Sequence, residues 1–164
     1  MKLRDNPEIY GYTTFCDDIR QEVGGKTSLI GCYAGTIWLH NPFPFTFPKF
    51  CFSIDLVQRR EIFDPNIELK ILLPGDADDA PSFEGKWTEP SPGIIAEETA
   101  KAVEGLPLSD QRTIAMHAKL IASPLVIKEA GIISVRGVRQ GELIRLGGIR
   151  IVQAPSQQLE QLPN

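Results

Sequence analysis

The stretch that decides the fold is "IISVRGVRQGELIRLGGIRIV", Ile132–Val152. Two runs rich in β-branched residues flank Gln140-Gly141, and a glycine there supplies the positive φ that a tight hairpin turn demands. With the turn at this dipeptide the two arms pair antiparallel, and Arg136 lies opposite Arg145. The stretch therefore predicts a β-hairpin, and we expect the chain around it to be built mainly of strands.

The same period-two pattern recurs along the chain. Runs of alternating β-branched or aromatic residues predict strands at residues 9–16, 19–23, 26–33, 36–40, 49–57, 67–73, 112–121, 125–128, 131–138 and 143–152. Only Ile94–Gly105, with acidic residues near its start and a glycine at its end, is predicted to be helical. The pattern favours a mainly β fold. We expect residues 1–155 to form a single antiparallel β-sandwich with one short helix, and residues 156–164 to form a flexible tail.

Composition excludes several classes of protein. The 164 residues fit one domain. The net charge of −4 argues against nucleic-acid binding, which needs a basic surface. No apolar run approaches the roughly 18 residues that span a bilayer, and the first residues lack the apolar segment of a signal peptide. We expect a cytoplasmic protein, with a virion as the other location, and no membrane contact.

The three cysteines, Cys16, Cys32 and Cys51, lie in strand-like contexts and form no CxxC motif. Free thiols in a reducing compartment are expected, because a metal site needs more ligands at closer spacing. The two histidines, His40 and His117, are read as ordinary strand residues, since no nucleophile lies near either in sequence. We therefore predict no catalytic residue and no cofactor.

Residues 74–104 carry eight acidic and two basic side chains, a net charge of −6, whereas residues 110–152 carry seven basic and three acidic, a net charge of +4. We expect a long acidic loop that leads into the short helix. Its "GDADDAP" segment offers Asp76, Asp78 and Asp79, which suit calcium in ligand type. Trp87 stands where an EF-hand loop needs a glutamate, so the EF-hand pattern is not met. The sequence remains compatible with calcium binding and with a metal-free loop.

The basic C-terminal hairpin is the natural counter-surface for negative charge. The acidic segment is expected to face it, within one chain or between copies, or else an acidic partner contacts it. A solvated strand face is the alternative. The predicted partner-binding residues are Arg136, Arg139 and Arg145 on the hairpin and the apolar Phe83 and Trp87 of the acidic segment.

A second hairpin is expected in "FCDDIRQEVGGKTSLIGCY", Phe15–Tyr33, with Gly24-Gly25 as its turn and Val23 opposite Lys26. That register makes Asp17 face Cys32. Asp17 and Asp18 are predicted to fix a β-bulge or turn through bonds to local backbone N–H groups. Metal or partner binding by this pair is the alternative. "NPFPFTFPKF", residues 41–50, is expected to cover one end of the core, or else to form an exposed docking patch.

The N-terminal hairpin resembles an uncharacterised family of small bacterial and phage proteins that open with a "CDDIR…E..GK..LIG.Y" segment. The matching residues are Cys16-Asp17-Asp18-Ile19-Arg20, Glu22, Lys26, Leu29-Ile30-Gly31 and Tyr33, with Gly147–Ile151 resembling the family's C-terminal end. The resemblance covers the two ends better than the acidic middle. It implies one whole-chain domain in a bacterial or phage setting and imports no catalytic residue.

These observations lead us to expect a non-catalytic β-sandwich that acts by protein–protein contact, as a structural or adaptor component or as a homo-oligomer. An inhibitor or recruiter of a host protein and a calcium- or ligand-dependent binding module are the alternatives, and an enzyme ranks last.

Overall fold

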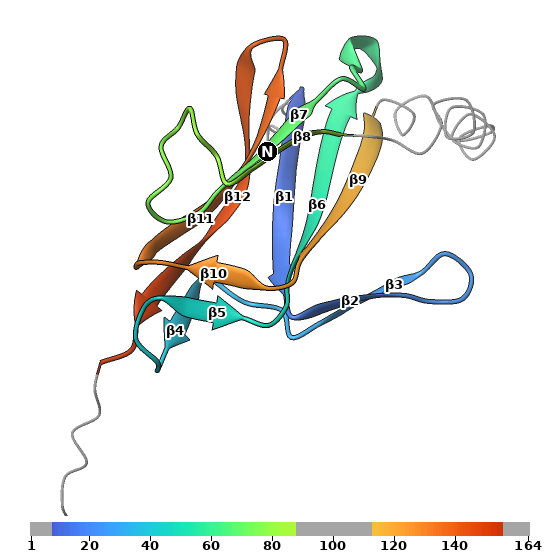
Figure 1. Cartoon of the computed structure of the whole chain (residues 1–164). Helices are drawn as coiled ribbons and strands as arrows, with labels where there is room; N and C mark the ends of the chain where they lie inside the picture. Colours follow the sequence, from blue (N-terminus) through green and yellow to red (C-terminus); the bar gives the residue numbers. More distant parts are fainter. Residues whose placement is uncertain (1–7, 88–112, 156–164) are drawn as a thin grey trace, which may run out of the picture.

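The computed structural model describes residues 8–87 and 113–155, and these residues are mostly strand (Figure 1). The strands in chain order are β1 Ile9–Cys16, β2 Asp18–Gln21, β3 Thr27–Ile30, β4 Thr36–Leu39, β5 Phe45–Phe47, β6 Phe50–Arg59, β7 Glu68–Leu72, β8 Phe83–Lys86, β9 Thr113–Ala122, β10 Leu125–Ile127, β11 Gly131–Arg139 and β12 Glu142–Gln153. A 3₁₀ turn, η1 at Arg60–Ile62, follows β6. The predicted helix at 94–105 and the tail at 156–164 lie outside the described residues.

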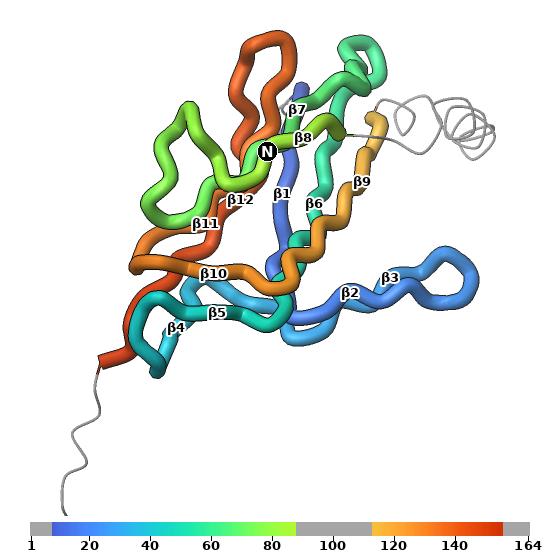
Figure 2. Tube along the Cα trace, in the orientation of Figure 1, coloured from blue at the N-terminus to red at the C-terminus, as the bar shows by residue number. Residues whose placement is uncertain are grey.

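Two sheets pack face to face, which confirms the mainly β, sandwich-type fold. One sheet has the order β1-β6-β9 and the other the order β4-β12-β11-β7-β8, while β10-β5 and β2-β3 form separate two-stranded ribbons. The pairing is antiparallel except between β12 and β4, which run parallel. Figures 1 and 2 show the β2–β3 ribbon projecting away from the body of the sandwich. In the described ranges no helix is long and apolar enough to cross a bilayer.

The core lies between the two sheets and follows from the period-two pattern of their strands. The inward side chains of the central strands β6, β11 and β12 are almost fully buried, namely Phe50, Phe52, Ile54, Leu56, Ile133, Val135, Leu146, Ile149 and Ile151. Each such side chain contributes about 1.5–3 kcal/mol through removal of apolar surface from water. The core therefore explains why these strands alternate as they do.

An aromatic cluster closes one end of this core. The ring centroid of Phe50 lies 5.0 Å from that of Phe47, 5.3 Å from Phe52 and 5.5 Å from Tyr33. Phe47 belongs to β5, a short strand that pairs with β10 and was not predicted. The interpretation of residues 41–50 as a core cover is therefore correct for Phe47 and Phe50, both of which are buried.

The C-terminal hairpin has the predicted turn and register. Gln140 and Gly141 both have positive φ, 49° and 84°, and Arg136 pairs with Arg145. Beyond that pair the register shifts, so that Val135 pairs with Gly147 and Leu146 forms a β-bulge. The hydroxyl of Thr13 on β1 donates a hydrogen bond of 2.9 Å to the Leu146 carbonyl oxygen. The bulge thus joins the two sheets, and bulges characteristically change the direction in which nearby side chains point.

The N-terminal hairpin differs from its predicted register by one residue. Gln21 pairs with Thr27, and the Glu22 N–H donates to the Lys26 carbonyl oxygen at 2.8 Å, so the loop has three residues rather than two. Gly24 and Gly25 both have positive φ, which a three-residue loop of this kind uses. Asp17 therefore does not face Cys32. It lies at the bend between β1 and β2, where its N–H donates to the Ile30 carbonyl oxygen at 3.0 Å.

The predicted long acidic loop is shorter than expected in its described part. Residues 83–86 form β8 on the edge of the five-stranded sheet, paired with β7. Trp87 is only 6% exposed, and its N–H donates to the Ile67 carbonyl oxygen at 2.7 Å. The strand escaped prediction because "FEGK" shows no alternation of apolar and polar residues. Only residues 74–82 form a loop here, and residues 88–104 lie outside the described part of the chain.

Candidate functional site

The outer face of the five-stranded sheet gathers apolar and cationic side chains. Their inward neighbours are buried, so alternation points them to solvent, with exposed fractions of 59% for Trp38, 52% for Ile132 and 54% for Leu143. Arg136, Arg145 and Arg150 share this face. Isolated exposed apolar residues are ordinary on protein surfaces, but Trp and Arg together on one sheet face are typical of contact surfaces. We call this set of six residues the outer face.

A groove crosses the outer face at the paired arginines. It has a volume of about 440 Å³ and is lined by Asp78, Ser134, Arg136, Leu143, Arg145 and Gly147. Arg136 donates from Nη1 to Asp78 Oδ1 at 2.7 Å and from Nε to Ser134 Oγ at 3.3 Å. Two like charges directly opposite on a sheet are unfavourable. Asp78 offsets one of them, while Arg145 makes no ion pair or side-chain hydrogen bond with any described residue.

The loop of residues 74–82 brings Asp78 to this groove. The Asp76 carboxylate holds the loop closed, because its Oδ2 accepts hydrogen bonds of 2.8 Å from the N–H groups of Leu73 and Ser82. Burial opposes ionisation, but these hydrogen bonds outweigh it and hold the pKa of Asp76 below its ordinary value. The Asp78 side chain is 83% exposed in this loop, and there it accepts the hydrogen bond from Arg136. The expectation that acidic segment and basic hairpin face each other is met within one chain by this contact.

The other predicted partner-binding residues lie elsewhere. Arg139 is mostly buried at the end of the hairpin, where its Nη2 donates to the Ile62 carbonyl oxygen at 2.6 Å. Trp87 is part of the core and presents almost no surface to a partner. Phe83 is 38% exposed and lines a separate apolar pocket of about 290 Å³ with Leu120 and Ile121. Arg139 and Trp87 are therefore corrected to structural residues, and Phe83 is separate from the arginine groove.

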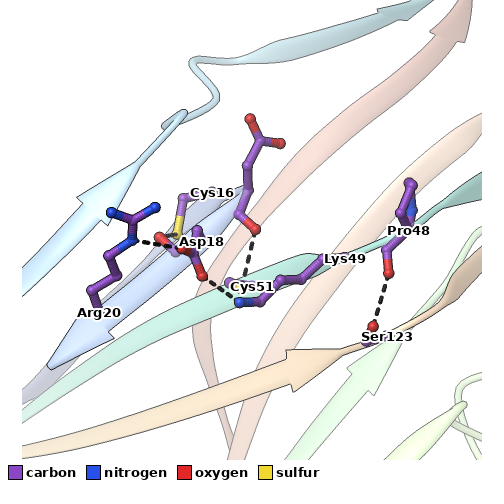
Figure 3. A network of polar contacts seen from close by, with 8 residues as sticks. Cys16, Asp18, Arg20, Pro48, Lys49, Cys51 and Ser123 are labelled. Carbon is purple, nitrogen blue, oxygen red and sulfur yellow. Dashed lines mark hydrogen bonds and ion pairs between the residues drawn. The ribbon is translucent and has the colours of Figure 1, made fainter.

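Asp17 and Asp18 lie at the corner between β1 and β2, and Figure 3 shows Asp18 with its partners Arg20 and Lys49. Asp18 accepts a hydrogen bond of 2.9 Å from Arg20 Nε and another from the Lys49 ammonium. The hydrogen bond from Lys49 has the largest effect and that from Arg20 the next largest, and they lower the pKa of Asp18 to about 2. Asp17 accepts the hydroxyl hydrogen bond of Tyr33. The predicted role at a bend agrees with this geometry, but the donors are side chains rather than the local N–H groups we expected.

The three cysteines surround the same corner as free thiols. Cys16 and Cys51 pair directly across β1 and β6 and are fully buried, whereas Cys32 is exposed. The two buried thiols each donate a weak hydrogen bond of 3.5 Å, Cys16 to the Asp18 carbonyl oxygen and Cys51 to that of Asp17. Burial is the main cause, and the neighbouring Cys51 adds to it, so the pKa of the Cys16 thiol is raised to about 11. These sulfurs are therefore protonated, and they support the bend.

Most of the candidate metal ligands, and His117, contact other protein groups in the described part of the chain. Among residues 8–87 and 113–155, no group of three or more His, Cys, Asp or Glu side chains is arranged to hold a metal ion. Asp76 and Asp78, the calcium candidates, are engaged by protein donors, and Asp79 is exposed beside them. His117 Nδ1 lies 2.9 Å from Asp55 Oδ1 in a cross-strand pair on the three-stranded sheet.

Among the described residues, the outer face brings predicted and unpredicted candidates together. Arg136 and Arg145 were predicted, whereas Trp38, Ile132, Leu143 and Arg150 were not. The signal for these four was the parity of their strands, since each occupies the position opposite to its buried neighbours. The resemblance to the bacterial and phage family stays a prediction, because comparison with protein-family models, with curated proteins and with solved structures finds no match for this chain.

Proposed function

We propose that this protein is a non-catalytic structural or adaptor component that acts by protein–protein contact, in a bacterial or phage setting. The outer face of the five-stranded sheet is its contact surface. The observation that carries the proposal is the exposure of Trp38, Ile132 and Leu143 on one sheet face among three arginines. Trp and Arg dominate the residues that account for most of the binding energy at protein interfaces, because they combine large contact area with directed hydrogen bonds.

The charges on this face favour an acidic partner over a second copy of the same face. Arg136 and Lys70 are paired with Asp78 and Glu84, whereas Arg145 and Arg150 have no anionic partner among the described residues. An isologous dimer through this face would place its unpaired arginines near those of the partner copy. Complementary charge instead speeds encounter and sets orientation. The partner surface is therefore acidic, with an apolar patch that receives Trp38.

An inhibitor or recruiter of a host protein would use the same face, so that alternative differs in the partner rather than in the surface. Genes for tails or capsids beside the coding sequence would favour the structural role. A calcium-dependent module gains no support from the loop of residues 74–82, because Asp76 is satisfied by backbone N–H groups.

A photo-crosslinking amino acid at residue 38 tests the proposal in cells that express the full chain. We expect a discrete protein adduct at this position and none at the matched position Tyr12, which is 56% exposed on the three-stranded sheet. Introducing Arg145→Glu should abolish the adduct while the circular dichroism spectrum stays unchanged. Equal adducts from residues 38 and 12 would show that the outer face is not the contact surface.

A further inference from the structure

We propose that the groove between Arg136 and Arg145 binds a carboxylate side chain of the partner's acidic segment, and that Asp78 is an internal competitor for this site. The inference rests on the proposed function and specifies the chemistry that the outer face recognises. The protein's own loop then holds the groove in a partly occupied state, which a partner carboxylate must displace.

The existing ion pair shows that the groove accepts a carboxylate. Asp78 Oδ1 lies 2.7 Å from Arg136 Nη1, a normal length for a charge-assisted hydrogen bond. The two side chains differ in how firmly they are held. Arg136 is 24% exposed and anchored by Ser134, whereas the Asp78 side chain is 83% exposed. An ion pair with so exposed an acid contributes little, so a better-placed carboxylate can replace it.

The rest of the groove is open on the side of Arg145. Arg145 stands opposite Arg136 across the hairpin, and no described residue neutralises it. Gly147 adds no side chain to the lining, and the exposed Leu143 forms an apolar wall. The volume of about 440 Å³ lies within the range of small-ligand sites, roughly 300–1,000 Å³. The fitting ligand is an acidic residue beside an apolar one, with its carboxylate shared between the two guanidinium groups.

The test titrates the full chain at low salt with a labelled peptide of alternating Glu and Leu, and separately with inorganic phosphate. Arg145→Ala should weaken peptide binding about tenfold, because it removes charge-assisted hydrogen bonds. Asp78→Asn should tighten binding about threefold, because it removes the internal competitor. Lys26→Ala serves as the matched control, since it deletes the same charge from the exposed loop between β2 and β3 and should leave the affinity unchanged.

Three outcomes would overturn the inference. Each outcome is judged in variants whose thermal melts equal that of the unaltered chain. In the first, Asp78→Asn leaves the peptide affinity unchanged or weakens it. In the second, Arg145→Ala has the same peptide affinity as Lys26→Ala. Alternatively, phosphate binds as tightly as the peptide and with the same dependence on Arg145, which would make the groove a general anion site. If crosslinking through residue 38 persists in these cases, the contact function stands and the assignment of the groove fails.

Discussion

Replacing Gly11 with alanine tests how closely β1 approaches β6 beside it and β12 in the facing sheet. Gly11 lies on β1 where this strand meets β12, and a Cβ atom there would lie 2.4 Å from the Asp55 carbonyl oxygen and 2.5 Å from Leu146 Cδ2. Leu146 could turn its side chain, but Asp55 lies within β6, which pairs with β1 on one side and β9 on the other. The carbonyl oxygen therefore cannot move alone, and β1 must shift away from β6.

The expected loss of stability follows from this clash. Inserting a methyl group into a packed interior costs about 1–3 kcal/mol, and a contact with fixed backbone places Gly11→Ala near the upper value. At roughly 2–4 °C per kcal/mol for a chain of this size, a loss of about 3 kcal/mol lowers the Tm by roughly 6–12 °C. Urea unfolding followed by tryptophan fluorescence, together with calorimetry, would measure both quantities.

Gly137→Ala is the matched control, because it changes a strand glycine on β11 in the same way. Its added Cβ would meet only side-chain atoms, Ile67 Cγ2 at 3.3 Å and Leu146 Cδ1 at 3.4 Å. Both substitutions gain the same intrinsic preference for extended backbone, so their difference isolates the clash at β1. We expect Gly137→Ala to be the milder by about 2 kcal/mol. A Gly11→Ala protein as stable as Gly137→Ala would refute the close approach of Gly11 to the Asp55 carbonyl oxygen of β6.

Three further predictions concern pH, thiols and calcium. Because the pKa of Asp18 is lowered from 3.8 to about 2, its ion pairs stabilise the fold above pH 4 and this contribution is lost as the pH falls toward 2; Asp18→Asn should flatten the acid side of a stability–pH curve, and an unchanged slope between pH 4 and 2 would contradict this. In the native protein only the exposed Cys32 should react promptly with a thiol reagent, and denaturation without reductant should reveal three thiols in all; a total of one would reveal a disulfide. Thermal melts in calcium and in chelator should coincide, because Asp76 is already satisfied by two N–H groups; a rise of several degrees in calcium would restore the calcium interpretation.

Much of the fold was predictable because period two and turn residues carry strong local information. The Gln140-Gly141 turn fixed the pairing of Arg136 with Arg145, since only a residue tolerant of positive φ fits there. The Gly24-Gly25 pair was ambiguous for the same reason. Two glycines serve a two-residue loop or the last positions of a three-residue loop, and the two options differ by one residue in register.

The candidate site was less predictable, because it depends on the direction of side chains across several strands. Alternation along β11 places Arg139 on the same side as the buried Val135 and on the opposite side from Arg136. Residues at the end of a hairpin often lie beyond the core, so this pattern alone does not predict that Arg139 is buried. Trp87 was assigned to a loop because its burial depends on Ile67 and not on its own neighbours in sequence. The contact of Asp78 with Arg136 joins residues 58 positions apart, and no pattern of neighbouring residues predicts it.

The position of β12 has a consequence for the synthesis of this protein. As the last described strand, it pairs with β4 and β11 and contacts β1 near the start of the chain. The ribosome therefore releases β4 long before its pairing partner β12 exists, and β1 long before the strand that packs against it. Such distant contacts form slowly. Until β12 is made, the apolar residues of these strands are exposed to water or bound by a chaperone. Unpaired strands exposed to water tend to aggregate. A truncation before Glu142 is thus expected to lower the soluble yield far more than the loss of residues 156–164, because it leaves the five-stranded sheet without the strand that joins β4 to β11.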